Sequence, residues 1–191
     1  MIFNIPNLIT LSRIIMIPLL VGIYYLPDDW LSPSNKDMTA TAIFIVAGIT
    51  DWLDGYLARR LNQMSAFGAF LDPVADKLIV VGALVVLMQL DPPRVGALVA
   101  LIIIGREVAI SALREWMAKV GQAKSVAVAF IGKLKTVSQM VAIPLLLFRD
   151  PLFGFDCLWW GTILINIAAV LTLASMLYYL RKALPHAVER S

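Results

Sequence analysis

The sequence predicts an all-α, polytopic membrane protein with six transmembrane helices. Three observations support this fold class. The 191 residues are 60% hydrophobic and only 15% charged, and the mean hydropathy is +0.84, a balance typical of a chain that lies within a bilayer. The apolar residues fall into six blocks, each close to or above the ~20 residues that cross a membrane as a helix. Turn-forming and polar residues separate these blocks.

The six blocks are the candidate spans. In order, they cover residues 8–26, 38–60, 67–90, 94–118, 126–148 and 157–180. The expected loops between them are Pro27-Asp28-Asp29 with Ser32-Pro33-Ser34-Asn35, then Asn62-Gln63, Asp91-Pro92-Pro93, Gly121-Gln122 and Arg149-Asp150-Pro151. Because the sequence contains no repeat or linker, we expect residues 1–191 to form a single membrane domain.

The first and last spans have features of their own. The stretch 3–10 mixes apolar and polar residues ahead of the first span, which predicts a short N-terminal interfacial segment. The last span is generic apolar sequence whose aromatic residues lie at its two ends, as interfacial belts do. These are Trp159, Trp160, Tyr178 and Tyr179.

The basic residues predict the orientation. Only Lys36, Arg94 and Arg149 lie near the loops after the first, third and fifth spans. Nine others gather on the opposite side: Arg13, Arg59, Arg60, Arg114, Lys119, Lys124, Arg181, Lys182 and Arg190. Because cytoplasmic loops carry the excess of Lys and Arg, this side and both termini are predicted to be cytoplasmic.

The net charge and the single cysteine bear on the class of protein. A formal charge of +3 and an isoelectric point near 9.1 are compatible with nucleic-acid binding. In a chain this apolar, however, the basic residues are better explained as topology signals and contacts to anionic ligands, so no nucleic-acid partner is expected. Cys157 has no second cysteine to pair with, and redox chemistry is not expected.

Four aspartates inside the apolar blocks mark the candidate site. Placing a carboxylate in hydrocarbon costs roughly 3 kcal/mol, so Asp51, Asp54, Asp72 and Asp76 require an explanation. The spacings of three and four residues put each pair on one helix face. A single such aspartate is often structural, but four at a similar depth repel one another unless cations lie among them.

The ligand chemistry of these carboxylates points to phosphoryl transfer. Oxygen-only ligands favour hard ions, so we predict two divalent cations, Mg²⁺ or Mn²⁺. Such a pair typically clamps phosphate oxygens during a displacement, and one carboxylate can remain free as a general base.

Small and polar residues near the aspartates suggest a nucleotide site. Gly55, Ala58 and Gly68 would let a nucleotide or pyrophosphate approach the helices, although helix packing explains any one of them nearly as well. Arg59 adds a planar donor for a phosphate. Three residues of the N-terminal segment share a face that could contact the nucleotide or cap the helix: Asn7, Thr10 and Arg13.

Cations of the fourth and fifth spans form a second set. Arg106 could pair with the glutamate that follows it, but its depth favours a role at a ligand or metal site, and Arg114 lies on roughly the same face. Lys133 and Lys135 point to different sides of a helix, so both are not expected to touch one small phosphate. We favour Lys135, with Gln139 one turn further on.

The pattern of these residues resembles a known family signature. It reads Asp51-x-x-Asp54-Gly55-x-x-Ala58-Arg59, eight residues, then Gly68-x-x-x-Asp72-x-x-x-Asp76, and it matches every fixed position of the CDP-alcohol phosphatidyltransferase signature. The resemblance implies a six-helix, homodimeric membrane enzyme that moves a phosphatidyl group from a CDP-lipid to an alcohol and releases CMP. It implies that the four aspartates bind the metal ions and that Asp76 is also the general base. Gly55, Ala58, Arg59 and Gly68 would surround the CDP group.

A narrower resemblance concerns the acceptor. Up to about residue 145 the chain is similar to bacterial members that use glycerol 3-phosphate, most clearly over 4–10, 105–117 and 132–136. This implies an enzyme of the bacterial inner membrane whose acceptor phosphate is bound by cations: Arg106, Arg114, Lys133 and Lys135. Other acceptors, namely phosphatidylglycerol, serine or inositol phosphate, remain alternatives within the family. From another class, intramembrane carboxylates facing basic helices are compatible with an ion or proton transporter.

Overall fold

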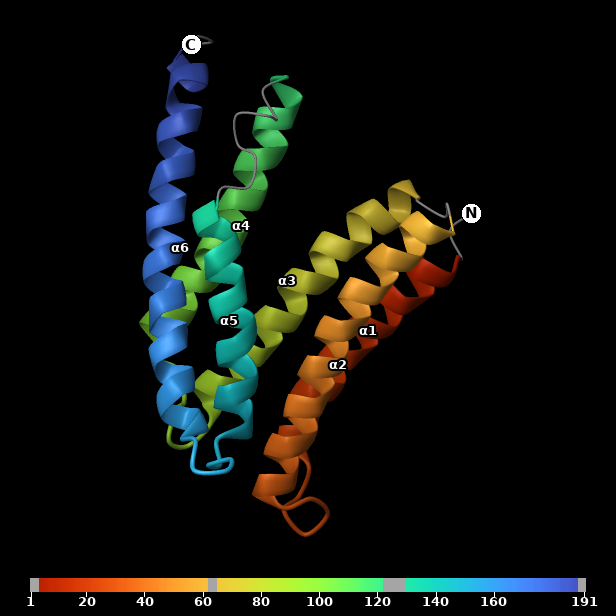
Figure 1. The fold of residues 1–191 in the computed structure, drawn as a ribbon, viewed down its shortest axis with the longest axis vertical. Helices are drawn as coiled ribbons and strands as arrows, with labels where there is room; N and C mark the ends of the chain where they lie inside the picture. The colour runs from red at the N-terminus through yellow and green to blue at the C-terminus, as the bar shows by residue number, and fades with distance from the viewer. Residues whose placement is uncertain (1–3, 62–64, 122–129, 189–191) are drawn as a thin grey trace.

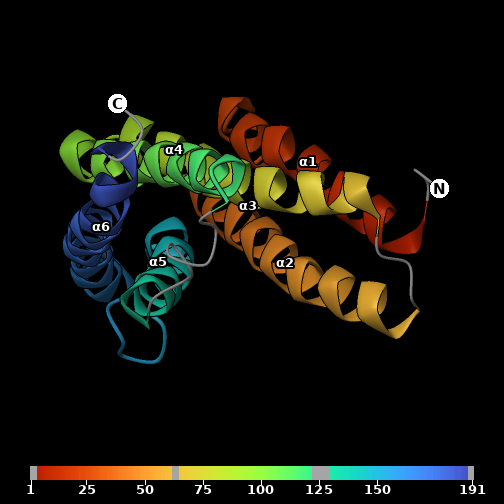
Figure 2. The same ribbon diagram turned by 90° about the horizontal axis from the view of Figure 1, so that it is seen from above.

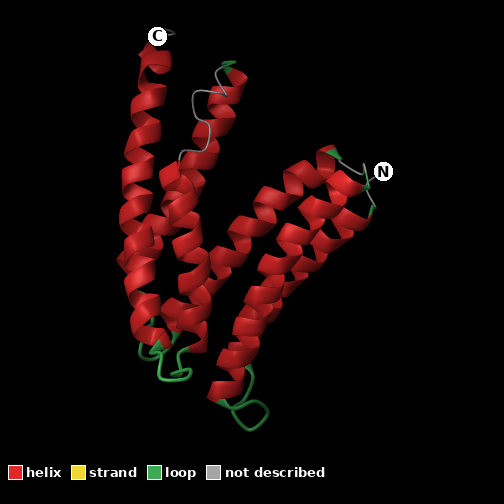
Figure 3. Cartoon of the chain, viewed as in Figure 1, coloured by secondary structure: helices red, strands yellow, loops and turns green. Residues whose placement is uncertain are grey.

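A computed structural model describes residues 4–61, 65–121 and 130–188. These residues form helices and no strand, apart from one isolated bridge between Leu152 and Phe155 (Figure 3). The elements are α1 (Ile5–Gly22), the 3-10 turn η1 (Ile23–Tyr25), α2 (Pro33–Arg60), α3 (Ala66–Gln89), α4 (Ala97–Lys119), α5 (Phe130–Phe148) and α6 (Cys157–Val188). The predicted all-α class is therefore confirmed.

Polar caps determine where the helices begin. The side chains of Asn4 and Ser65 accept hydrogen bonds, both of 2.9 Å, from the amides of Asn7 and Gly68, which satisfies amides that have no partner inside the helix. Because α1 begins at Ile5, residues 5–10 are its first turns. The stretch predicted to be interfacial is thus helical and continuous with α1 over the residues described, and its position at the membrane interface stays a prediction.

The helices form two groups joined by α3. Figure 1 shows α1 and α2 on one side and α4, α5 and α6 on the other, with α3 crossing between them, and Figure 2 shows the same division from above. The most extensive contacts pair α5 with α6 and α1 with both α2 and α3. In Figure 1 the chain begins at the upper end of α1 on the right and finishes at the top of α6 on the left.

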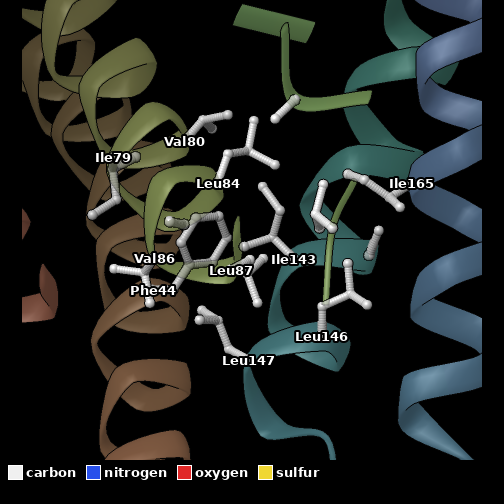
Figure 4. Packing of buried hydrophobic residues seen from close by; sticks show 14 of the residues in the cluster. Phe44, Ile79, Val80, Leu84, Val86, Leu87, Ile143, Leu146, Leu147 and Ile165 are labelled. Carbon is white, nitrogen blue, oxygen red and sulfur yellow. The ribbon is translucent and has the colours of Figure 1, made fainter. Parts of the chain in front are cut away.

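The apolar core occupies one half of the helix bundle. It includes Phe44 of α2, Leu84 and Leu87 of α3, and Ile143 and Leu146 of α5, each 3% exposed or less (Figure 4). On α2 these core positions precede the aspartates, and on α3 they follow them. The packed half therefore holds the two helices together beside the carboxylates and leaves the other half of each helix for the site.

Within the described residues, three helices are long and apolar enough to cross a membrane: Ile5–Tyr25, Pro33–Arg60 and Cys157–Leu184. A shorter apolar helix covers Leu134–Phe148. α3 carries three charged side chains, Asp72, Asp76 and Lys77, and α4 carries five: Arg106, Glu107, Arg114, Glu115 and Lys119. Length and composition thus show an all-helical membrane protein with three candidate spans, half the number that we predicted.

Candidate active site

The carboxylates of α2 and α3 converge on one guanidinium from α1. Arg13 is 1% exposed, and its Nη1 donates to Asp51 Oδ1 at 2.9 Å and to Asp76 Oδ1, while its Nη2 donates to Asp54 Oδ2. Asp54 is buried, whereas about 40% of the Asp51 and Asp76 side chains is exposed. Arg13 therefore offsets the mutual repulsion of three carboxylates at a site that solvent or a ligand can reach.

Thr10 joins the fourth aspartate to this cluster. Its hydroxyl lies 3.0 Å from Asp54 Oδ2 and 2.8 Å from Asp72 Oδ1, and 3.1 Å from the carbonyl of Pro6 one turn earlier. Thr10 and Arg13 are three residues apart on α1, so one face of that helix contacts all four aspartates. The structure therefore brings the predicted carboxylates together.

A pocket of about 160 Å³ lies against this cluster at the first turns of α1 and α3. Five of the six residues predicted to bind the CDP group line it, together with Asp72: Asn7, Gly55, Ala58, Arg59 and Gly68. The sixth, Thr10, contacts Asp72 directly. The predicted nucleotide residues thus come from three helices and share one concave surface.

Close packing explains the need for glycine at position 68. A Cβ there would lie 2.5 Å from Asn7 Oδ1 and 3.1 Å from Ser65 Oγ, so no side chain fits without displacing the pocket wall. The Ser65 hydroxyl donates to Asn7 Oδ1 at 3.1 Å and also accepts from the Gly68 amide. The sequence did not predict Ser65 as a site residue. The one feature that could have identified it is its position as a helix N-cap, directly before the apolar residues of α3.

A second pocket of about 250 Å³ lies on the other side of the carboxylates. Its charged and amide-bearing lining residues come from four helices: Asp51, Asp76, Lys77, Glu107, Lys135 and Gln139. Lys135 is 3% exposed and forms an ion pair with Glu107. The general base predicted at Asp76 and the cation that we favoured at Lys135 therefore line one cavity.

The two arginines of α4 face α6 rather than this second pocket. Arg106 donates to Glu107 Oε1 at 3.4 Å and to Ser175 Oγ at 3.3 Å, and the Arg114 guanidinium lies 5.5 Å from the centre of the Tyr179 ring. Neither arginine lines the second pocket. Glu107 nevertheless pairs with both Arg106 and Lys135, so Arg106 adjoins the cavity through an ion-pair chain. The side chain of Lys133 lies outside the part of the chain that is described.

An apolar groove leads from the carboxylates along α2 and α5. It consists of two adjoining cavities of about 540 and 360 Å³, which share Ile45 and Pro144. The first cavity reaches Asp51, and the second ends at Leu152 and Cys157. The site therefore combines two polar pockets with a long apolar surface.

The chemistry of the carboxylates suits a hard divalent ion, because every donor is an oxygen. In the structure, the positive charge among them is the guanidinium of Arg13. No group of three or more acidic, histidine or cysteine side chains among the described residues is arranged to hold an ion. The four aspartates therefore fit a cation by their chemistry and shared location, and their role as metal ligands stays a prediction.

Comparison with known proteins agrees with the signature. The model of the CDP-alcohol phosphatidyltransferase family matches residues 3–180. The chain is 51% identical to CDP-diacylglycerol–glycerol-3-phosphate 3-phosphatidyltransferase of Salmonella choleraesuis (strain SC-B67) and of Escherichia coli (strain K12), and 50% identical to the protein of the same name from Salmonella typhimurium (strain LT2). Each match covers 95% of this chain and 95% of the relative. The chain therefore belongs to the CDP-alcohol phosphatidyltransferase family.

Proposed function

We propose that this protein transfers the phosphatidyl group of CDP-diacylglycerol to glycerol 3-phosphate, giving phosphatidylglycerophosphate and CMP. The observation that carries the proposal is the position of the four carboxylates between two polar pockets. Asp72 lines the pocket with the predicted nucleotide residues, and Asp51 and Asp76 line the pocket with Lys135. The names of the relatives contain the same donor and acceptor.

Each part of the donor has a matching surface. The CMP portion would occupy the pocket around Gly55, Arg59 and Gly68, where the Arg59 guanidinium can bind a phosphate. The acyl chains would lie in the groove between α2 and α5, whose lining is almost wholly apolar. This arrangement brings the pyrophosphate to the carboxylates, and the groove leaves the chains in contact with the bilayer.

The reaction itself would be a direct displacement at phosphorus. The primary hydroxyl of the acceptor gives its proton to Asp76 and its oxygen forms a bond to the phosphorus that carries diacylglycerol. The bond between that phosphorus and the bridging oxygen breaks, and CMP leaves. Two divalent cations, Mg²⁺ or Mn²⁺, held by the four aspartates would supply positive charge to the pyrophosphate oxygens.

The membrane arrangement completes the proposal. We infer one domain over residues 1–191 with six spans, in which α3, α4 and α5 cross together with the three candidate spans. The distribution of basic residues supports a cytoplasmic location for both termini and the site, at the bacterial inner membrane. A homodimer is inferred from the family resemblance, and no nucleic-acid partner is expected.

An acceptor panel tests this function. Purified protein with CDP-diacylglycerol and added Mg²⁺ or Mn²⁺ should release CMP with glycerol 3-phosphate, and far more slowly with serine, inositol phosphate or phosphatidylglycerol. Asp76→Asn should lose CMP release while keeping the thermal unfolding midpoint of the parent. Release with another acceptor alone would reassign the substrate. Ion flux in sealed vesicles without CMP release would favour a transporter instead.

A further inference from the structure

The second pocket contains one cation that no described residue neutralises. Lys77 lines it beside Asp51, Asp76, Glu107 and Lys135. Lys135 is ion-paired with Glu107, whereas Lys77 forms no ion pair or hydrogen bond within the described ranges 4–61, 65–121 and 130–188. Among the charged groups of this lining, Lys77 is therefore the ammonium that is available to a ligand.

A second side chain of the same lining also lacks a partner. Gln139 is 4% exposed, and its Oε1 has no hydrogen-bond partner among the described residues. A buried amide oxygen without a partner is unfavourable unless a ligand or water donates to it. An ammonium and a hydrogen-bond acceptor on one cavity suit a small ligand that carries both an anionic group and a hydroxyl.

The charge balance of the pocket strengthens this assignment. Three carboxylates face two ammonium groups, and one of the ammonium groups is already paired. A dianionic ligand would be repelled by the carboxylates unless it could contact a free cation directly. A neutral alcohol would have no such requirement.

We propose that Lys77 is a specificity-determining residue that binds the phosphate of the acceptor, with the Gln139 Oε1 accepting a hydrogen bond from its secondary hydroxyl. This rests on the proposed function. Lys77 adds to Lys135 a cation on α3, next in sequence to Asp76. The acceptor would thus be held between α3 and α5 with its primary hydroxyl toward the carboxylates.

Steady-state kinetics of Lys77→Met and Lys77→Arg test the assignment. Loss of a hydrogen bond to a charged group should raise the KM for glycerol 3-phosphate about tenfold or more in Lys77→Met. The KM for CDP-diacylglycerol should stay within about twofold, and Lys77→Arg should recover part of the loss. Lys119→Met is the matched control, because Lys119 is exposed and pairs with Glu115 outside both pockets.

The alternatives give different results. An unchanged KM for glycerol 3-phosphate in Lys77→Met, at an unchanged unfolding midpoint, would overturn the proposal. A rise in the KM for CDP-diacylglycerol alone would assign Lys77 to the donor, and a lower kcat at constant KM would mean that it acts through Asp76. If the parent protein itself releases no CMP with glycerol 3-phosphate, the proposed function fails, and this inference fails with it.

Discussion

At the level of single residues, Arg13 is the group that makes four neighbouring carboxylates compatible with a folded protein. Its guanidinium contacts Asp51, Asp54 and Asp76 from α1. Such a planar donor can serve several carboxylates at once, which a lysine cannot do as well. A divalent cation bound among the same oxygens would supply positive charge to the same groups. Arg13 and bound metal should therefore partly replace one another as sources of stability.

Replacing Arg13 tests whether bound metal can stabilise the carboxylates in place of its guanidinium. Without metal, we expect Arg13→Met to lower the free energy of unfolding by roughly 3 kcal/mol. This is the lower end of the range for breaking a buried ion pair, because two of the three aspartates that Arg13 contacts are partly exposed. For a chain of this size that corresponds to a fall of roughly 6–12 °C in the unfolding midpoint. Added Mg²⁺ or Mn²⁺ should reduce the difference in unfolding midpoint between Arg13→Met and the parent protein. Thermal unfolding in detergent, with chelator and with each ion, measures both effects.

A control separates this effect from the general loss of a basic side chain. Arg181 is exposed on α6, so Arg181→Met should leave the midpoint unchanged with or without ions. If divalent ions stabilise the parent and Arg13→Met by equal amounts, Arg13 and metal do not share a site. No stabilisation of either protein by the ions would argue against metal binding at the aspartates.

At the level of elements, a buried ion pair joins α2 to the segment that enters α4. Arg94 and Asp37 are both 8% exposed and lie 2.5 Å apart, and Arg94 Nη1 donates to the carbonyls of Leu146 and Leu147 at 3.1 and 2.8 Å. Tyr24 donates to the other oxygen of Asp37 at 3.0 Å. This network connects η1, α2 and α5 at the end of the bundle away from the carboxylates.

Removing one member of this pair should be more harmful than removing both. Arg94→Met leaves the Asp37 charge buried, so we expect a loss of roughly 3–5 kcal/mol. The double variant Asp37→Leu with Arg94→Met should be more stable than Arg94→Met alone. Unfolding midpoints of the single and double variants measure the coupling. Additive losses would show that the two charges do not stabilise one another.

At the scale of the whole molecule, local spacing predicted what lies on one helix face but not which faces meet. That the aspartates of each helix share a face was predictable, because their spacings of three and four residues define faces of α2 and α3. The contact of Arg13 with those faces depends on how α1 is rotated and packed, which no local pattern encodes. For the same reason the sequence suggested that Arg106 and Arg114 bind the acceptor, whereas the structure places them against Ser175 and Tyr179 of α6. Lys77 was overlooked because it belongs to no fixed position of the signature.

The number of spans is the remaining property of the whole molecule, and it depends on α3, α4 and α5. These helices are not among the three that length and composition support as spans. The charged residues of α3, namely Asp72, Asp76 and Lys77, line the two pockets, as does Glu107 of α4. If those charges face the protein interior, the outer faces can still cross the bilayer, because exposed residues such as Leu98, Leu101 and Val108 are apolar.

Single cysteines in a Cys157→Ser background can decide between three spans and six. Cys157 is buried and its replacement removes the only native thiol. The exposed positions that separate α3, α4 and α5 are Leu61, Asp91, Lys119 and Phe153. With six spans, a membrane-impermeant maleimide added to intact spheroplasts should label cysteine at 91 and 153, and should label it at 61 and 119 only after permeabilisation. Each of the three helices is bracketed by one position on either side. Labelling of two successive positions from the same side would therefore identify the helix that does not cross.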